Sequence, residues 1–237
     1  EIYTLSLHDA LPIWRCEALN RHAATMRMRG RPKVVLARNY EEALALYEKY
    51  KDNTLGVISD AQFPVNGKKD PEAGLKLLRA IRAEDEYVPL IMESSDSENR
   101  QRAEAEGFRF VDKNSKKMSI DLRRIMEEHM GFGDFIFRDP KTREELVRIH
   151  SLKELQDNIF KIPRDSMLYH ISRNHMSRWL TARAIFPVSA FLKQVTWHKL
   201  QDVDAHRQII FDAIVQYRHM KNIGVVAVFD RCKFDKY

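Results

Sequence analysis

Four short apolar runs alternate with charged, amphipathic segments between residues 34 and 130, and this alternation restricts the fold of the chain more than any other feature. The apolar runs are VVLA (34–37), LGVIS (55–59), VPLIM (88–92) and FRFV (108–111). The segments between them, such as EEALALYEKY and EAGLKLLRAIR, have their apolar residues at helical spacing. Continuous Val, Ile and Leu runs between charged helices are typical of parallel strands covered on both faces. The sequence therefore predicts an α/β fold with a doubly wound parallel sheet over residues 14–130.

The pattern changes after residue 131. A turn signal at Asp139, Pro140 and Lys141, between the apolar segments FIF and ELVRI, predicts a small hairpin that, with a linker, occupies residues 131–162. Ser151 with Glu154 makes a capping box at the start of a short helix. Over residues 163–237 we expect a mostly helical segment, with longer helices at 175–194 and 202–221 and a strand at VVAVF (225–229).

The first thirteen residues, EIYTLSLHDALPI, resemble the translation of a sequencing-library adapter. A targeting peptide is the alternative for an N-terminal segment, but Glu1 and Asp9 are acidic and the apolar residues are interrupted. We therefore treat residues 1–13 as an artefact that takes no part in the fold. The natural protein is expected to have other residues before position 14, and a helix is predicted over residues 14–29.

Composition excludes several classes of protein. With 237 residues, 44% of them hydrophobic, the chain can bury one or two cores, and it has no uncharged run long enough to cross a membrane. The two cysteines, Cys16 and Cys232, indicate neither a disulfide framework nor a thiolate zinc cluster, which favours the cytoplasm. The 40 Lys and Arg residues against 34 Asp and Glu permit nucleic-acid binding without indicating it.

Two further motifs receive structural interpretations. RGRP (29–32) has the core of a minor-groove hook, but it leads directly into an apolar run and is interpreted as an exposed turn. His170 and His175 are five residues apart, so they would not share one face of a helix, and no metal-binding pair is predicted there.

Polar side chains close three of the predicted strands. Asp60, Ser94 and Lys113 each stand where an apolar run ends, and in a doubly wound sheet those ends meet at one edge. A carboxylate nucleophile, a hydroxyl donor and an ammonium that balances charge could together accept a phosphoryl group. Ser95 is an alternative hydroxyl, and Glu93 is interpreted as a packing or solvent-facing residue.

These motifs together resemble a two-component receiver domain. The matching strings are Asp60-Ala61-Gln62-Phe63-Pro64 after LGVIS, VPLIMES ending in Ser94, and FVDK ending in Lys113. The resemblance implies a flavodoxin-like sheet with strand order 2-1-3-4-5. It also implies that Asp60 is the phosphoacceptor, that Ser94 and Phe110 are switch residues, and that Lys113 binds the phosphoryl group. The phosphodonor would be a histidine kinase or a small phosphorylated molecule.

The receiver resemblance also implies Mg²⁺, bound by the carboxylate of Asp60 and the backbone carbonyl of Gln62. The remaining acidic ligands of the family lie at the end of its first strand, which would precede residue 14, so the site is expected to be incomplete. Asn114 stands where the family has a proline after the lysine. Because the first strand is central, VVLA and LGVIS would lose a partner, and each unpaired backbone group would cost roughly 1–3 kcal/mol if buried.

The remainder of the chain carries a second resemblance. GFGDFIF, IHSLKELQDNIFKIP, SRWLTARAIFP and FDAIVQYRHMKNIGVVAVF are similar to the segment that joins a receiver-like domain to the nucleotide- and pyruvate-binding domain of phosphoenolpyruvate synthase or pyruvate, phosphate dikinase-like proteins. This resemblance implies a regulatory fragment that is not itself catalytic, with the phosphotransfer domain downstream as its partner. The alternatives are a degenerate receiver that only docks partners, and a response regulator whose helical tail binds DNA.

Overall fold

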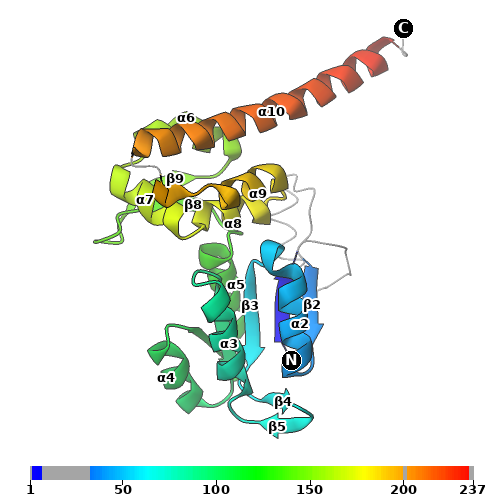
Figure 1. Cartoon of the computed structure of the whole chain (residues 1–237), viewed down its shortest axis with the longest axis vertical. Coiled ribbons are helices and arrows are strands. Elements are labelled where there is room, and N and C mark those ends of the chain that lie inside the picture. Colours follow the sequence, from blue (N-terminus) through cyan, green and yellow to red (C-terminus); the bar gives the residue numbers. More distant parts are fainter. Residues whose placement is uncertain (1, 7–32, 200–201, 235–237) are drawn as a thin grey trace. The chain divides into compact units, whose positions relative to one another are not determined.

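The computed structural model describes residues 2–6, 33–199 and 202–234 (Figure 1). The chain divides into two compact units. Unit 1 comprises Glu1–Gly133 with Thr181–Ala184, and unit 2 comprises Asp134–Leu180 with Ile185–Tyr237. The helix predicted over residues 14–29 and the RGRP turn lie outside the described residues.

Unit 1 contains a five-stranded sheet. Its strand order is β2 (Lys33–Ala37), β1 (Ile2–Ser6), β3 (Gly56–Asp60), β6 (Leu90–Ser94) and β7 (Arg109–Asp112). β3 pairs with β6, and β6 pairs with β7, in parallel. The predicted α/β class is therefore confirmed, and three of the four apolar runs read from the sequence form parallel-paired strands, whereas the first, β2, pairs antiparallel with β1.

The helices of unit 1 follow the amphipathic segments. Among the described residues these are α2 (Tyr40–Tyr50), α3 (Ala73–Glu84), α4 (Ser97–Ala105) and α5 (Met118–His129), and a 3-10 turn, η2, at Lys51–Asn53 follows α2. Asn39 and Asp96 cap α2 and α4 by accepting hydrogen bonds from the backbone N–H groups of Glu42 and Glu98. The apolar face of α3, which includes Leu75 and Leu78, packs in the same buried cluster as β3 and β6.

A short two-stranded ribbon, β4 (Phe63–Val65) with β5 (Lys68–Asp70), follows the predicted phosphoacceptor and was not predicted. Asn66 and Gly67 connect the two strands, with φ of 50° and 74°. Two successive residues with positive φ are the geometry of a type I′ hairpin turn, for which Asn-Gly is the preferred pair.

The expectation that β2 and β3 lack a partner is wrong. β1, from the segment treated as an artefact, lies between them and pairs antiparallel with both, with Tyr3 opposite Leu36 on one side and Ile58 on the other. The backbone groups at the centre of the sheet are therefore hydrogen-bonded. β1 can form backbone hydrogen bonds with both β2 and β3 in the antiparallel direction, because antiparallel neighbours need no crossover connection between them. Residues 2–6 thus take part in the fold, whatever their origin.

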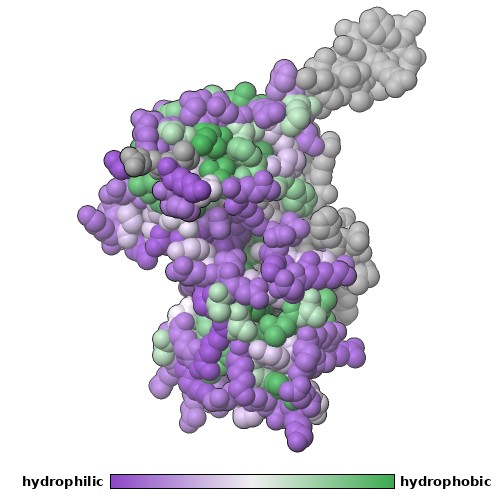
Figure 2. Space-filling view, viewed as in Figure 1, coloured by the Kyte–Doolittle hydropathy of each residue, from purple (hydrophilic) through white to green (hydrophobic). Residues whose placement is uncertain are grey.

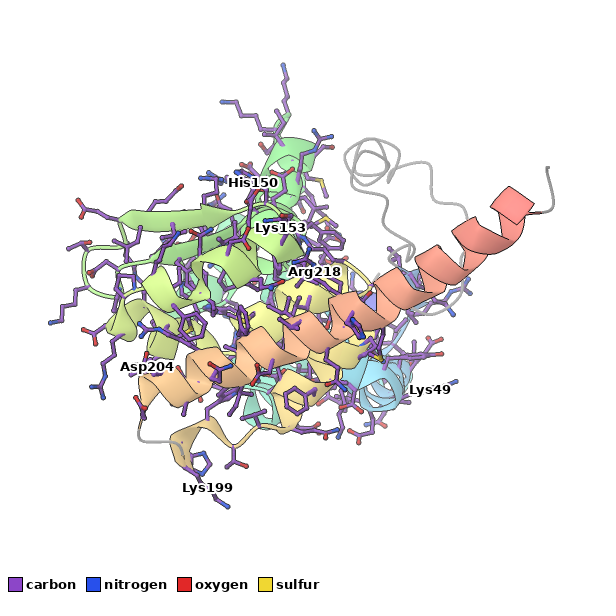
Figure 3. The ribbon with its side chains drawn as sticks, turned by 90° about the horizontal axis from the view of Figure 1, so that it is seen from above. Lys49, His150, Lys153, Lys199, Asp204 and Arg218 are labelled. Atoms are coloured by element: carbon purple, nitrogen blue, oxygen red, sulfur yellow. The ribbon has the colours of Figure 1, made fainter. Side chains whose placement is uncertain are left out.

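Unit 2 begins with the predicted hairpin, β8 (Phe135–Arg138) and β9 (Glu145–Ile149). Its helices are α6 (Leu152–Asn158), α7 (Arg164–Ser172), α8 (His175–Ala182), α9 (Phe186–Gln194) and α10 (Val203–Phe234), with the 3-10 turns η3 (Ile159–Lys161) and η4 (Trp197–Lys199). Ser151 caps α6 by accepting from the N–H of Glu154, as predicted. Seen from above, Arg218 of α10 lies beside α6, where its guanidinium donates to Oε1 of Gln156 (Figure 3).

Two helix predictions in unit 2 need correction. The single helix expected over residues 175–194 is two helices, because Ala184 adopts a φ of 56°, which ends α8, and α9 then begins at Phe186. The strand expected at VVAVF is wrong, since these residues belong to α10. Strand preference of β-branched residues depends on their context, and an established helix adds residues at low cost.

Each unit has its own buried core. In unit 2 the largest buried side chains are Trp179 and Phe137, which share one cluster with Ile210 and Ile214 of α10. Hydrophilic side chains cover most of the visible face of each unit (Figure 2). Among the described helices, none combines the length and the apolar character that crossing a membrane requires.

Candidate functional site

Three consecutive parallel strands end at one edge of the sheet in unit 1. Asp60 is the last residue of β3, Ser94 is the last residue of β6, and Lys113 directly follows β7. Because parallel strands share a direction, their carboxyl ends lie together. The structure brings two of these residues into direct contact: Nζ of Lys113 lies 2.7 Å from Oδ2 of Asp60.

The carboxylate of Asp60 is held at both oxygens. Oδ2 accepts from Lys113, and Oδ1 accepts from the backbone N–H of Ala61 at 2.7 Å. The side chain keeps 26% of its surface exposed. Behind it, α3 approaches so closely that a Cβ at Gly74 would lie 2.3 Å from the carbonyl oxygen of Asp60. The strand end is thus fixed from behind, while the carboxylate stays accessible from solvent.

Glu93 also belongs to this edge, and of the two expected placements it takes the buried one. It is opposite Asp60 in the β3–β6 register, only 7% of its surface is exposed, and Oε1 lies 3.7 Å from Nζ of Lys113. The sequence signal for this position was an acidic residue directly after the apolar residues 90–92 of the same strand. Lys113 therefore bridges two carboxylates from adjacent strands.

The charged groups at this edge shift one another's pKa values. Burial raises the pKa of Glu93, Lys113 partly offsets that increase, and the neighbouring Asp60 raises the pKa further. Burial alone would lower the pKa of Lys113, but the hydrogen bond to Asp60 and the charges of Asp60 and Glu93 outweigh it and raise the pKa. Lys113 therefore stays an ammonium ion, as binding of an anion requires.

The hydroxyl of Ser94 is engaged with α4. Oγ accepts from the backbone N–H of Asp96 at 3.1 Å and from Nδ2 of Asn99 at 3.1 Å, and both Ser94 and Asn99 are buried. The carbonyl of Ser94 accepts from the backbone N–H of Lys113 at 3.0 Å. Ser94 thus links the strand end that carries Lys113 to the beginning of α4.

The other predicted residues surround this centre less closely. Phe110 is half-buried in β7, and the guanidinium carbon of Arg100 in α4 lies 4.8 Å from its ring centroid. Gln62 is exposed. Asn114, in the position of the family's proline, donates from Nδ2 to the carbonyl of Ser95 at 3.0 Å, which joins the loop after β7 to the end of β6.

Two observations concern the expected Mg²⁺ ligands. Among them no three His, Cys, Asp or Glu side chains are grouped to hold a metal ion. Both oxygens of Asp60 already accept hydrogen bonds, and Glu93 lies beside Lys113 rather than beside a further acid. Binding of Mg²⁺ through Asp60 and the carbonyl of Gln62 stays a prediction that needs additional oxygen ligands.

Replacing Glu93 by glutamine is expected to stabilise unit 1 at neutral pH. Because burial raises the pKa of Glu93, the protonated side chain favours the folded state, and that contribution is lost as the pH rises from the ordinary carboxyl range through the pKa of the folded protein. Urea unfolding at about pH 5 and about pH 8 should show a smaller loss of stability in Glu93→Gln than in the wild type. Glu86→Gln, at an exposed position, is the control. An identical loss in the wild type and Glu93→Gln would contradict this coupling.

The geometry of this edge guides the functional interpretation more directly than any other feature of unit 1. Two carboxylates, a hydroxyl and an ammonium come from three neighbouring strands and lie where each strand ends. No family model, curated protein or solved structure matches the chain.

Proposed function

We propose that unit 1 is a phosphoacceptor module of the receiver type in phosphorelay signalling. The observation that supports this most strongly is the 2.7 Å contact between Lys113 and Asp60, whose positions are 53 residues apart in the chain. A half-exposed carboxylate that ends a parallel strand, with an ammonium beside it, has the nucleophile and the charge partner that phosphoryl transfer needs.

The transfer uses the residues of this edge as follows. A carboxylate oxygen of Asp60 forms a bond to the phosphorus of a phosphohistidine or of a small acyl phosphate. The bond from phosphorus to the donor nitrogen or oxygen breaks, and the leaving group retains the electron pair. Lys113 then pairs with the oxygens of the new acyl phosphate, which carries more negative charge than the carboxylate did.

The same arrangement supports Ser94 and Phe110 as the switch. If the Ser94 hydroxyl turns to donate to the phosphoryl group, the N–H of Asp96 and the amide of Asn99 lose their acceptor. Both groups belong to the first turn of α4 or its cap, and α4 buries only Asn99 and Ala103. A helix with so little buried surface can move at low cost, and movement would change the contact between Arg100 and Phe110.

The proposal extends to the setting of the module. A histidine kinase or a small phosphodonor would phosphorylate it in the cytoplasm, with Mg²⁺ held partly by ligands beyond the described residues. A downstream phosphotransfer domain of the phosphoenolpyruvate synthase kind would read the altered α4 surface. This extension depends on the resemblance of residues 131–237 to phosphoenolpyruvate synthase-like proteins. It does not depend on the geometry of the sheet edge.

A docking module is the second candidate. The observation on its side is that both carboxylate oxygens of Asp60 already accept hydrogen bonds, from Lys113 and from the N–H of Ala61. In that case the ion pair is structural, and the exposed faces of the helices bind a partner without phosphorylation.

Labelling separates these two candidates. The chain is incubated with radioactive acetyl phosphate and Mg²⁺, alongside Asp60→Asn and the control Asp112→Asn, which removes the neighbouring strand-end acid whose Oδ1 accepts from the N–H of Asn114. We expect label on the wild type and Asp112→Asn, and at least about tenfold less on Asp60→Asn, because the amide is not nucleophilic. Absence of label from the wild type would favour docking. Equal label on Asp60→Asn would disprove Asp60 as the acceptor.

A further inference from the structure

Two arginines of unit 2 contact Tyr169, a residue of α7, and a third arginine contacts one of them. The guanidinium carbons of Arg173 and Arg143 lie 4.2 Å and 5.2 Å from the centroid of its ring. Arg143 also donates to the Tyr169 hydroxyl, and Arg173 donates to the Tyr169 carbonyl at 3.3 Å. The third, Arg138, donates from Nη1 to the carbonyl of Arg143 at 3.2 Å. The three arginines thus come from the end of β8, from the hairpin turn and from the residue that follows α7.

The buried neighbour of this ring, His170, responds to all three charges. Its pKa is lowered to about 4, first by burial and then by the positive charges of Arg138, Arg173 and Arg143. Glu145 is opposite Arg138 in the hairpin register and interacts with its charge, whereas in the described parts of the chain no carboxylate lies within ion-pair distance of Arg143. Like charges held together raise the electrostatic free energy of the folded chain, and a bound anion would lower it.

The hairpin turn holds Arg143 in position. Oδ1 of Asp139 accepts from the backbone N–H groups of Lys141 and Thr142, and the N–H of Arg143 donates to the carbonyl of Asp139 at 3.0 Å. The turn is therefore ordered by its own hydrogen bonds. A guanidinium that is already positioned loses less conformational entropy when it binds an oxyanion.

A groove of about 540 Å³ adjoins the cluster and shares Tyr169 and Arg173 with it. Trp197 and His206 also line the groove, with their rings stacked at a centroid distance of 5.5 Å and an interplanar angle of 21°. Asp165 contributes a carboxylate to the lining, so the groove is not uniformly suited to anions. Flat rings beside a cationic cluster suit a ligand with one anionic group and one planar apolar part.

We propose that Arg138, Arg143 and Arg173 bind the phosphate group of a small phosphate monoester, whose organic part occupies the groove beside Trp197. Guanidinium groups match the oxygens of a phosphate with paired N–H donors, which makes phosphate the oxyanion that best fits three arginines. This site is independent of the proposed phosphoacceptor, because none of its residues belongs to unit 1.

The test titrates the whole chain with inorganic phosphate and with phenyl phosphate at constant ionic strength, which keeps charge screening equal. Calorimetry gives the affinity, and a change in tryptophan fluorescence that is lost in Trp197→Phe reports on Trp197. We expect saturable binding of both probes and tighter binding of phenyl phosphate, whose ring reaches the groove. Arg143→Gln and Arg173→Gln should each weaken binding about tenfold or more, as loss of a charged hydrogen bond does.

Arg148→Gln is the matched control. Arg148 lies on the same hairpin and loses the same charge, but it pairs with Glu145 and Asp134 and is not part of the cluster. The affinity of the Arg148→Gln variant for both probes should stay within about twofold of that of the wild type. Equal weakening in Arg148→Gln would show that surface charge alone attracts phosphate, and no saturable binding to the wild type would also overturn the site. Equal affinity for the two probes would overturn the groove assignment.

Circular dichroism shows whether each variant folds. If Arg143→Gln does not fold, Arg143→Lys keeps the charge but lacks the paired donors. We expect Arg143→Lys to bind phosphate more weakly than the wild type, and unchanged affinity would contradict recognition by a guanidinium fork.

Discussion

Gly74→Ala should lower the free energy of unfolding of unit 1 by about 2 kcal/mol, although alanine is the better helix former. Inside a helix, replacing glycine by alanine favours the folded state by up to about 1 kcal/mol. At this position, however, the new Cβ would lie 2.3 Å from the carbonyl oxygen of Asp60 and 3.0 Å from Cα of Ala61. Both are backbone atoms, so relief requires α3 or the end of β3 to move. Overpacking typically costs about 1–3 kcal/mol, and contacts this short justify the upper end.

Urea unfolding followed by circular dichroism measures this effect. Lys76→Ala changes an exposed residue of the same helix and removes one ion pair with Asp70, so it should cost less than about 1 kcal/mol. Gly74→Ala should also reduce phosphorylation, because the displaced strand end carries Asp60. A variant as stable as the wild type would contradict the close packing of α3 behind the site.

The contact between Asp60 and Lys113 was predictable because it depends only on strand order. Apolar runs identify the strands, parallel strands end at one edge, and the residue that follows each run is visible in the sequence. The position of Glu93 was not predictable in this way. Side chains alternate between the two faces of a strand, so which way Glu93 points depends on a register that the sequence does not show.

The direction of β1 and the division of the long helix depend on interactions that the local pattern does not reveal. β1 is antiparallel to both neighbours, which the pattern of β2 and β3 could not indicate. Ala184 adopts a positive φ, which is uncommon for alanine and has no sequence signal. The β4–β5 ribbon differs, because Asn66-Gly67 is a recognised turn signal that could have been used.

The rings of His170 and His175 lie closer together than a continuous helix over these residues would place them. Five residues of continuous helix would separate His170 from His175, yet their Nδ1 atoms lie 3.0 Å apart. The helix is interrupted at Asn174, which has a φ of 54°, so His170 lies in the last turn of α7 and His175 begins α8. Among the described residues, no group of three His, Cys, Asp or Glu side chains that could hold a metal ion is found at this contact.

Trp179→Ala should destabilise unit 2 by about 3–5 kcal/mol, the usual cost of truncating a fully buried tryptophan. Trp179 lies on α8 with 1% of its surface exposed, and its ring meets that of Phe135 edge to face at a centroid distance of 5.7 Å. It packs in one cluster with residues of the hairpin, α7 and α10. A cavity at this position would therefore remove contacts from several elements at once, rather than from one helix.

Phe191→Ala is the control for this prediction, because it also truncates an aromatic side chain in unit 2, but one that is 47% exposed on α9. Its cost should be within about 1 kcal/mol. Urea unfolding followed by circular dichroism measures both variants, and hydrogen exchange should show faster exchange in α7 and α8 of Trp179→Ala. A loss of less than about 1 kcal/mol in Trp179→Ala would contradict a single packed core in unit 2. The phosphate-binding proposal depends on that core, because β8, the hairpin turn and α7 must be held together for the three arginines to converge.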